Sequence, residues 1–191
     1  MSEATKSDLT DQFDKYSAEF MQETERGIAL LAISMLDLVL TELIRNFLAD
    51  VPSSGKLLDG FNAPLGTFAS RVEAAHAFGL ISDEEASDIH LMRKIRNEFA
   101  HSFGISFSDP VVKSRVDALQ FSNAPHRRGD DETSGGNVAR NRFSHVAILL
   151  NIRLISRAKL ITRLTVQDWF FYPESVQPPK RPKPSRRAEK P

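Results

Sequence analysis

The chain has 191 residues, of which 41% are hydrophobic and 26% charged, a length and composition that suit one domain with a single core. It has no cysteine, which excludes a disulfide framework, a thiolate metal site and a thiol nucleophile. The formal net charge is zero, but residues 1–137 hold 13 basic and 22 acidic side chains, whereas residues 138–191 hold 12 basic and 3 acidic ones. The basic part therefore either faces the acidic part of the chain or attracts an anionic partner such as nucleic acid.

The beginning of the chain is predicted to form a polar arm followed by one long buried helix. Residues 1–18 are polar, without the apolar stretch of a signal peptide, and are expected to be frayed or weakly helical and to lie outside the core. Between residues 19 and 49 apolar side chains recur at steps of three and four, which predicts a helix buried over much of its circumference. Charges at Asp37, Glu42 and Arg45 argue against a membrane span. We expect a soluble, cytoplasmic protein.

The next segment is predicted to be a loop followed by a second helix. Residues 50–62 are rich in proline, serine and glycine, a composition typical of a loop. The second helix is expected to start after Asn62, with Pro64 in its first turn, and to stop at Gly79, which suits a left-handed C-terminal cap.

Two further helices carry clear start signals. Ser82 and Glu85 have the spacing of a capping box, so a third helix is expected from there to shortly before Gly104. Asp109 is expected to cap a short fourth helix that has Pro110 at its first position.

The remainder is predicted to be a polar loop, a last long helix and a tail. Residues 122–137 have almost nothing apolar to bury, whereas residues 138–164 have a helical apolar pattern. Residues 169–172 are the one candidate for a strand stub, and 173–191 form an extended, basic, proline-rich tail. The predicted fold is all-α: a single bundle of about five main helices over residues 19–172, with flexible termini.

The last turn of the third helix is the predicted functional focus. At about 100° per residue, His90, Lys94, Asn97 and His101 share one polar edge, and Arg96 lies on its flank, from where it could fold toward His101. A histidine can move protons to or from a ribose hydroxyl and a guanidinium can stabilise the charge of a phosphorane, with no metal required. The alternative is that the same residues only cap the helix and form ion pairs.

The pattern Arg96-Asn97-x-x-x-His101 resembles the arginine-x4-histidine motif of HEPN domains. These helical bundles often dimerise and form a metal-independent ribonuclease site across the dimer. The resemblance implies catalytic roles for Arg96 and His101, with Asn97 in support.

A wider set of motifs, from about residue 25 to residue 120, resembles the mannitol operon repressor family. The motifs are Leu57-Leu58-Asp59-Gly60, Pro64-Leu65-Gly66, Arg71, Phe78-Gly79-Leu80-Ile81 and the ten residues from Met92 to His101. The resemblance implies an all-helical regulator without a helix-turn-helix that acts through a partner. The loop at 122–137 and the tail lie outside it, so specificity for mannitol genes does not follow.

Arginines also line the last helix, and Arg142, Arg153 and Arg157 fall on neighbouring positions of it. They either contact phosphates of a nucleic acid, where RNA fits better than sequence-specific DNA, or pack beside the acidic N-terminal helices. The residues predicted to bind a partner are thus His90, Arg93, Lys94, Arg142, Arg153 and Arg157. The sequence predicts no cofactor and no metal site, since no group of histidines has metal-ligand spacing.

Three hypotheses follow from these patterns. The first is a regulatory protein of the mannitol repressor type that binds a protein or a nucleic acid. The second is a metal-independent HEPN-type endoribonuclease, a toxin or defence component, acting as a homodimer. The third is a dimerisation or adaptor module without catalysis.

Overall fold

The computed structural model describes residues 3–121 and 138–166. Within them the chain forms seven helices and no strand: α1 (Glu3–Phe20), α2 (Glu25–Phe47), α3 (Pro52–Leu58), α4 (Phe68–Ala77), α5 (Asp83–His101), α6 (Pro110–Asp117) and α7 (Val138–Leu160). The all-α prediction is confirmed, with two more helices than expected. The predicted strand stub at 169–172, the loop at 122–137 and the tail at 173–191 lie outside the described residues.

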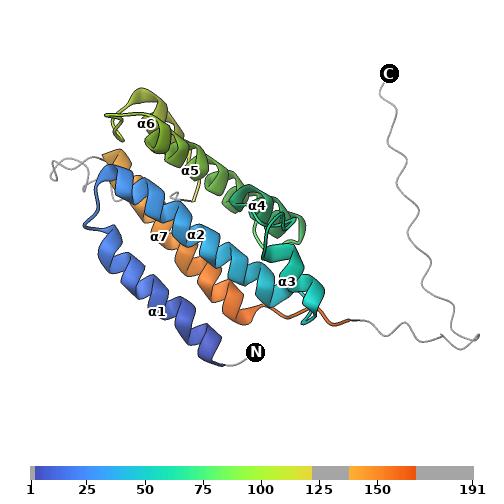
Figure 1. The fold of residues 1–191 in the computed structure, drawn as a ribbon. Coiled ribbons are helices and arrows are strands. Elements are labelled where there is room, and N and C mark those ends of the chain that lie inside the picture. Colours follow the sequence, from blue (N-terminus) through green and yellow to red (C-terminus); the bar gives the residue numbers. More distant parts are fainter. Residues whose placement is uncertain (1–2, 122–137, 167–191) are drawn as a thin grey trace, which may run out of the picture.

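Helix α2 is the centre of the bundle. It contacts α1 and α7 on one side and α4 and α5 on the other, so most of its apolar side chains are buried (Figure 1). By length and composition α2 could span a membrane, but 56% of its most apolar stretch of 18 residues is buried inside the bundle. Its role as the central helix was predicted, although it begins at Glu25 after the Thr24 cap rather than near residue 19.

Helix α1 corrects the expectation that residues 1–18 lie outside the core. Leu9, Tyr16 and Phe20 are buried, and Phe13 packs beside them against α2 and α7. The four residues are spaced by four, three and four positions, which is the spacing of one helical face. This apolar stripe was overlooked because the rest of the segment is strongly polar.

Local signals fix both ends of α4 and the start of α5. Thr67 caps α4 by accepting a hydrogen bond from Ser70 N (3.1 Å). At its end Gly79 adopts φ +70°, and Leu80 N donates to Ala75 O (2.8 Å), the pattern of a Schellman motif. The predicted capping box of α5 is present between Ser82 and Glu85. Helix α4 therefore begins five residues later than expected, but it ends just before Gly79, as predicted.

Two other segments differ from the prediction. The expected loop at 50–62 contains α3, a helix of seven residues that begins at Pro52. Helix α7 ends at Leu160 rather than 164, and the chain then returns to α2, where Leu164 N donates to Phe47 O (2.7 Å). Proline at the first position starts a helix at little cost, and this explains α3 in a segment whose composition favours a loop.

Candidate functional site

Part of the predicted polar turn of α5 lines a pocket between three helices. The pocket has a volume of about 350 Å³ and lies between the middle of α2, the start of α4 and the last turns of α5. Three of the predicted residues, Arg93, Arg96 and Asn97, line it from α5. The opposite walls include Asp37 of α2 and Phe68 of α4. The structure thus brings together a part of the predicted site.

Some charged side chains of this pocket have an ion-pair partner within the described part of the chain and others do not. The carboxylate of Asp37 is bound by Arg71 (Nη1 to Oδ1, 2.6 Å). The Arg93 side chain has no hydrogen-bond or ion-pair partner among the described residues, and its buried Nε is without an acceptor. Among the residues that the structure describes, Arg96 donates only to the neighbouring Asn97 (Nη1 to Oδ1, 3.3 Å). Two guanidinium groups therefore line the pocket without a carboxylate of their own.

The remaining residues of the polar edge do not share one site. His90 faces α4, where its Nε2 lies 3.3 Å from Oε1 of Glu73. Lys94 and His101 are exposed and do not line the pocket. The expectation that Arg96 folds toward His101 differs from the structure, in which Arg96 bonds to Asn97. The side chain turns into the hollow between the helices instead of along the end of its own helix.

Beyond His101 the chain carries an exposed aromatic residue. Phe103 is 97% exposed, and Arg26 of α2 lies over its ring at 5.9 Å. The Arg26 guanidinium also donates to Ser102 O (2.7 Å), which ties this loop to the start of α2. Aromatic residues and arginine are enriched at protein–protein interfaces relative to the rest of the surface. Phe103 is not among the residues predicted from sequence, although it follows the predicted turn by only two residues.

The arginines of α7 are bound within the molecule. Arg157 forms a two-point ion pair with Glu85 (2.7 and 3.0 Å), and Arg153 reaches the same carboxylate (3.1 Å). Glu85 is fully buried. Burial opposes its charge, but the hydrogen bonds from Arg157 and Ser82 and the charge of Arg153 together hold the pKa of Glu85 below its usual value. The acid that pairs with these arginines therefore belongs to α5 and not to the N-terminal helices named in the packing alternative.

Arg142 and the neighbouring carboxylate of Asp88 hold the segment after α6. Arg142 donates to Leu119 O (2.7 Å), while the buried Asp88 accepts from the N–H groups of Gln120 and Phe121 (2.9 and 2.8 Å). Burial raises the pKa of Asp88, and these hydrogen bonds and the charge of Arg142 oppose that rise. Arg142 is thus engaged by backbone carbonyl groups.

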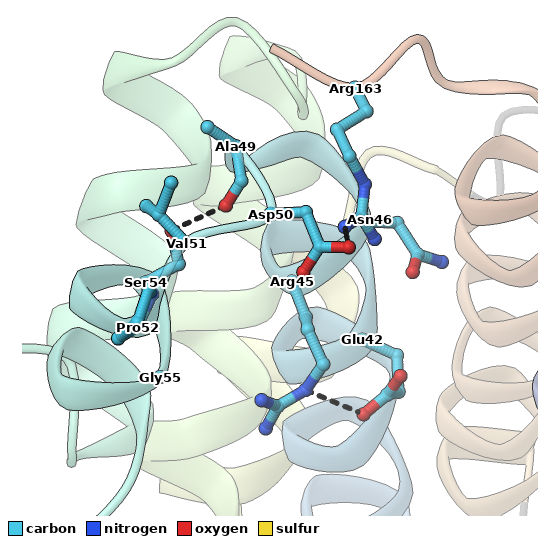
Figure 2. Close-up of a pocket in the computed structure, with 10 residues that line it drawn as sticks. All are labelled: Glu42, Arg45, Asn46, Ala49, Asp50, Val51, Pro52, Ser54, Gly55 and Arg163. Carbon is cyan, nitrogen blue, oxygen red and sulfur yellow. Dashed lines mark hydrogen bonds and ion pairs between the residues drawn. The ribbon is translucent and has the colours of Figure 1, made fainter. Parts of the chain in front are cut away.

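A larger hollow of about 510 Å³ lies beside α3 (Figure 2). Its charges are paired with one another: Arg45 binds Glu42 (3.2 Å) and Asp59 (3.0 Å), and Arg163 lies 3.3 Å from Asp50. Figure 2 shows Arg45 turned toward Glu42 and Arg163 extended toward Asp50. Since each cation already has an anion, this hollow offers less unpaired charge to a ligand than the pocket beside α5.

No protein-family model matches this sequence, and no curated protein matches it significantly. A chain of the X-ray structure of the MtlR–HPr complex from Escherichia coli is similar in fold, with a TM-score of 0.53. The similarity covers 76% of this chain and 99% of that chain, at 21% sequence identity. The helical bundle implied by the resemblance to mannitol operon repressors is therefore also found in a solved structure.

Proposed function

We propose that this protein is a regulator of the mannitol operon repressor type and acts by binding a protein partner. The observation that carries the proposal is the similarity in fold to a chain of the MtlR–HPr complex, which extends over 99% of that chain. The sequence motifs between residues 25 and 120 point to the same family. We further propose that the partner is a protein of the HPr type.

The proposed contact surface is the end of α5 and the residues directly after it, defined by His101 and Phe103. Both side chains are exposed, and Phe103 offers an aromatic ring beside the charge of Arg26. Interfaces commonly place an aromatic anchor at the centre and charged groups at the rim. The arginines of α7 support this choice indirectly, because the carboxylate and carbonyl groups that bind them leave less charge for a nucleic acid.

Calorimetric titration with the HPr-type protein of the same organism tests the proposal. We expect saturable binding by the wild type and a loss of at least about tenfold in affinity for Phe103→Ser, in keeping with an aromatic anchor. The matched control is Phe61→Ser, since Phe61 is 98% exposed and lies three residues after α3 in the chain. In Figure 1, α3 lies at the end of the bundle away from α6, the helix that follows α5. Absence of binding by folded wild type would contradict the proposed partner, and equal losses for both variants would contradict the proposed surface.

The second candidate is the HEPN-type endoribonuclease. It is favoured by the positions of Arg96 in an open pocket and of His101 exposed at the end of the same helix, where a second copy of the chain could approach. Incubation with mixed RNA in the presence of a chelator tests it. Cleavage lost in both His101→Ala and Arg96→Ala supports catalysis, whereas a folded dimer that leaves RNA intact excludes it. An adaptor role is the remaining reading if neither RNA cleavage nor HPr binding is observed.

A further inference from the structure

The pocket between α2, α4 and α5 is built to surround a small anion. Arg93 and Arg96 project from successive turns of α5, and neither has a carboxylate partner among the residues the structure describes. Most other arginines of the bundle are bound by an acid or by backbone carbonyls, as are Arg71, Arg115 and Arg157. A half-buried guanidinium with unused donors is costly, so a bound anion would satisfy groups that the chain leaves open.

The opposite wall of the pocket also favours negative charge. Thr67, Phe68 and Ala69 line it, and they form the cap and the first two positions of α4. The Thr67 hydroxyl already accepts from Ser70 N, so the N–H groups of Phe68 and Ala69 remain as donors at the start of the helix. The N-terminus of a helix of ten residues carries partial positive charge and binds phosphates well.

The one carboxylate of the pocket does not cancel these charges. Asp37 Oδ1 is bound at 2.6 Å by Arg71, a side chain only 13% exposed. Because Arg71 neutralises Asp37, this carboxylate does not compensate the positive charges of Arg93 and Arg96. Asn97 adds an amide beside them, and Ile33 and Phe68 add an apolar wall.

We propose that this pocket binds a small phosphate monoester. A phosphate has three terminal acceptor oxygens, which match two guanidinium groups and the amides of a helix start better than the two oxygens of a carboxylate do. The volume of about 350 Å³ is near the lower end of small-molecule sites, and the apolar wall suits a few carbon atoms attached to the phosphate. The ligand site does not depend on the proposed protein partner, since the lining residues all belong to one chain.

Calorimetric titration of the full chain with glycerol 3-phosphate tests the site, with inorganic phosphate and succinate as comparison ligands and potassium chloride added to match the ionic strength. We expect one saturable site for glycerol 3-phosphate, weaker binding of inorganic phosphate and at least about tenfold weaker binding of succinate. No saturable binding of glycerol 3-phosphate up to about 10 mM would overturn the proposal. Equal affinity for succinate would overturn the preference for phosphate.

Three variants separate the pocket from general electrostatics. Arg96→Gln should weaken binding of glycerol 3-phosphate at least about tenfold, because one charge-assisted contact is lost. Lys94→Gln removes the same charge from an exposed position outside the pocket and should bind like the wild type. Ala69→Glu places a carboxylate at the start of α4, where it favours the helix, and should abolish binding without lowering the melting temperature. An equal loss in Lys94→Gln, or unchanged binding in Ala69→Glu, would overturn the site.

Discussion

The arginines of α7 and those of α5 occupy opposite situations in one bundle. Arg153 and Arg157 converge on the fully buried carboxylate of Glu85, whereas Arg93 and Arg96 line a pocket without a carboxylate of their own. The sequence analysis names arginines of both helices as residues that could bind a partner. The two pairs differ because the fold places the carboxylate of Glu85 against the arginines of α7 but pairs no carboxylate with Arg93 or Arg96 among the described residues. Only Arg93 and Arg96 therefore have positive charge available for a ligand.

The comparison also shows how one helix can serve both purposes. Glu85 lies in the first turn of α5 and joins it to α7, while Arg93 and Arg96 lie two and three turns further along and face α2 and α4. The first half of α5 therefore stabilises the bundle and the second half forms the candidate site. Substitutions in the first half should then lower the free energy of unfolding, whereas substitutions in the second half should weaken ligand binding.

Glu85→Gln should have the largest effect on stability. The change leaves Arg157 and Arg153 near a neutral amide, and breaking a buried pair by removing one partner typically costs 3–5 kcal/mol. Because Arg153 is about half exposed, we expect a loss of about 3 kcal/mol in the free energy of unfolding. Urea denaturation measures it.

The matched control is Glu84→Gln, an exposed carboxylate one residue earlier in the same first turn. It should cost about 0.5 kcal/mol, the contribution of an acid at a helix start. Equal losses for the two variants would show that the buried ion cluster contributes nothing beyond the helix dipole.

The effect of Glu85→Gln should depend on pH. The pKa of Glu85 is lower in the folded protein than in the unfolded chain, so its contribution is complete above the unfolded value of about 4.3 and is lost as the pH falls through the folded pKa. The stability difference between wild type and variant should therefore be largest near neutral pH and shrink below about pH 4. A difference that stays constant down to acid pH would contradict the ionised state of Glu85.

Arg157→Gln should destabilise the fold less than Glu85→Gln but more than Arg153→Gln. Arg157 loses two contacts to Glu85 and one to Leu80 O (2.7 Å), although Arg153 still compensates the carboxylate. We expect a loss of about 2 kcal/mol for Arg157→Gln and about 1 kcal/mol for Arg153→Gln. The reverse order in thermal or urea unfolding would mean that the more exposed arginine dominates the pair.

The local features of this fold can be predicted from the sequence. The caps at Ser82 and Gly79 were predictable because each depends on residues within a few positions. The buried stripe of α1 was also present in the sequence, as the spacing of Leu9, Tyr16 and Phe20 shows. The helical class was predicted from the same kind of local periodicity.

The pairing of charges was not predictable in this way. Arg157 and Glu85 are 72 positions apart, and the pocket combines walls from three helices. No local pattern tells which arginine meets an acid and which does not, since that depends on how the helices are rotated and packed. The polar edge of α5 was therefore predicted as one site, whereas packing assigns His90 to Glu73 and Arg96 to the pocket.

Arg96→Gln should have the smallest effect on stability, and this tests the contrast most directly. Its one hydrogen bond, to Asn97 at 3.3 Å, is long, and no buried carboxylate loses a partner when the charge is removed. We expect a change within about 0.5 kcal/mol, similar to that of the exposed Lys94→Gln. A loss as large as that of Arg157→Gln would mean that Arg96 is structural. A small loss in the free energy of unfolding together with weakened binding of glycerol 3-phosphate would show that Arg96 serves ligand binding, because removal of a structural arginine would lower the stability more.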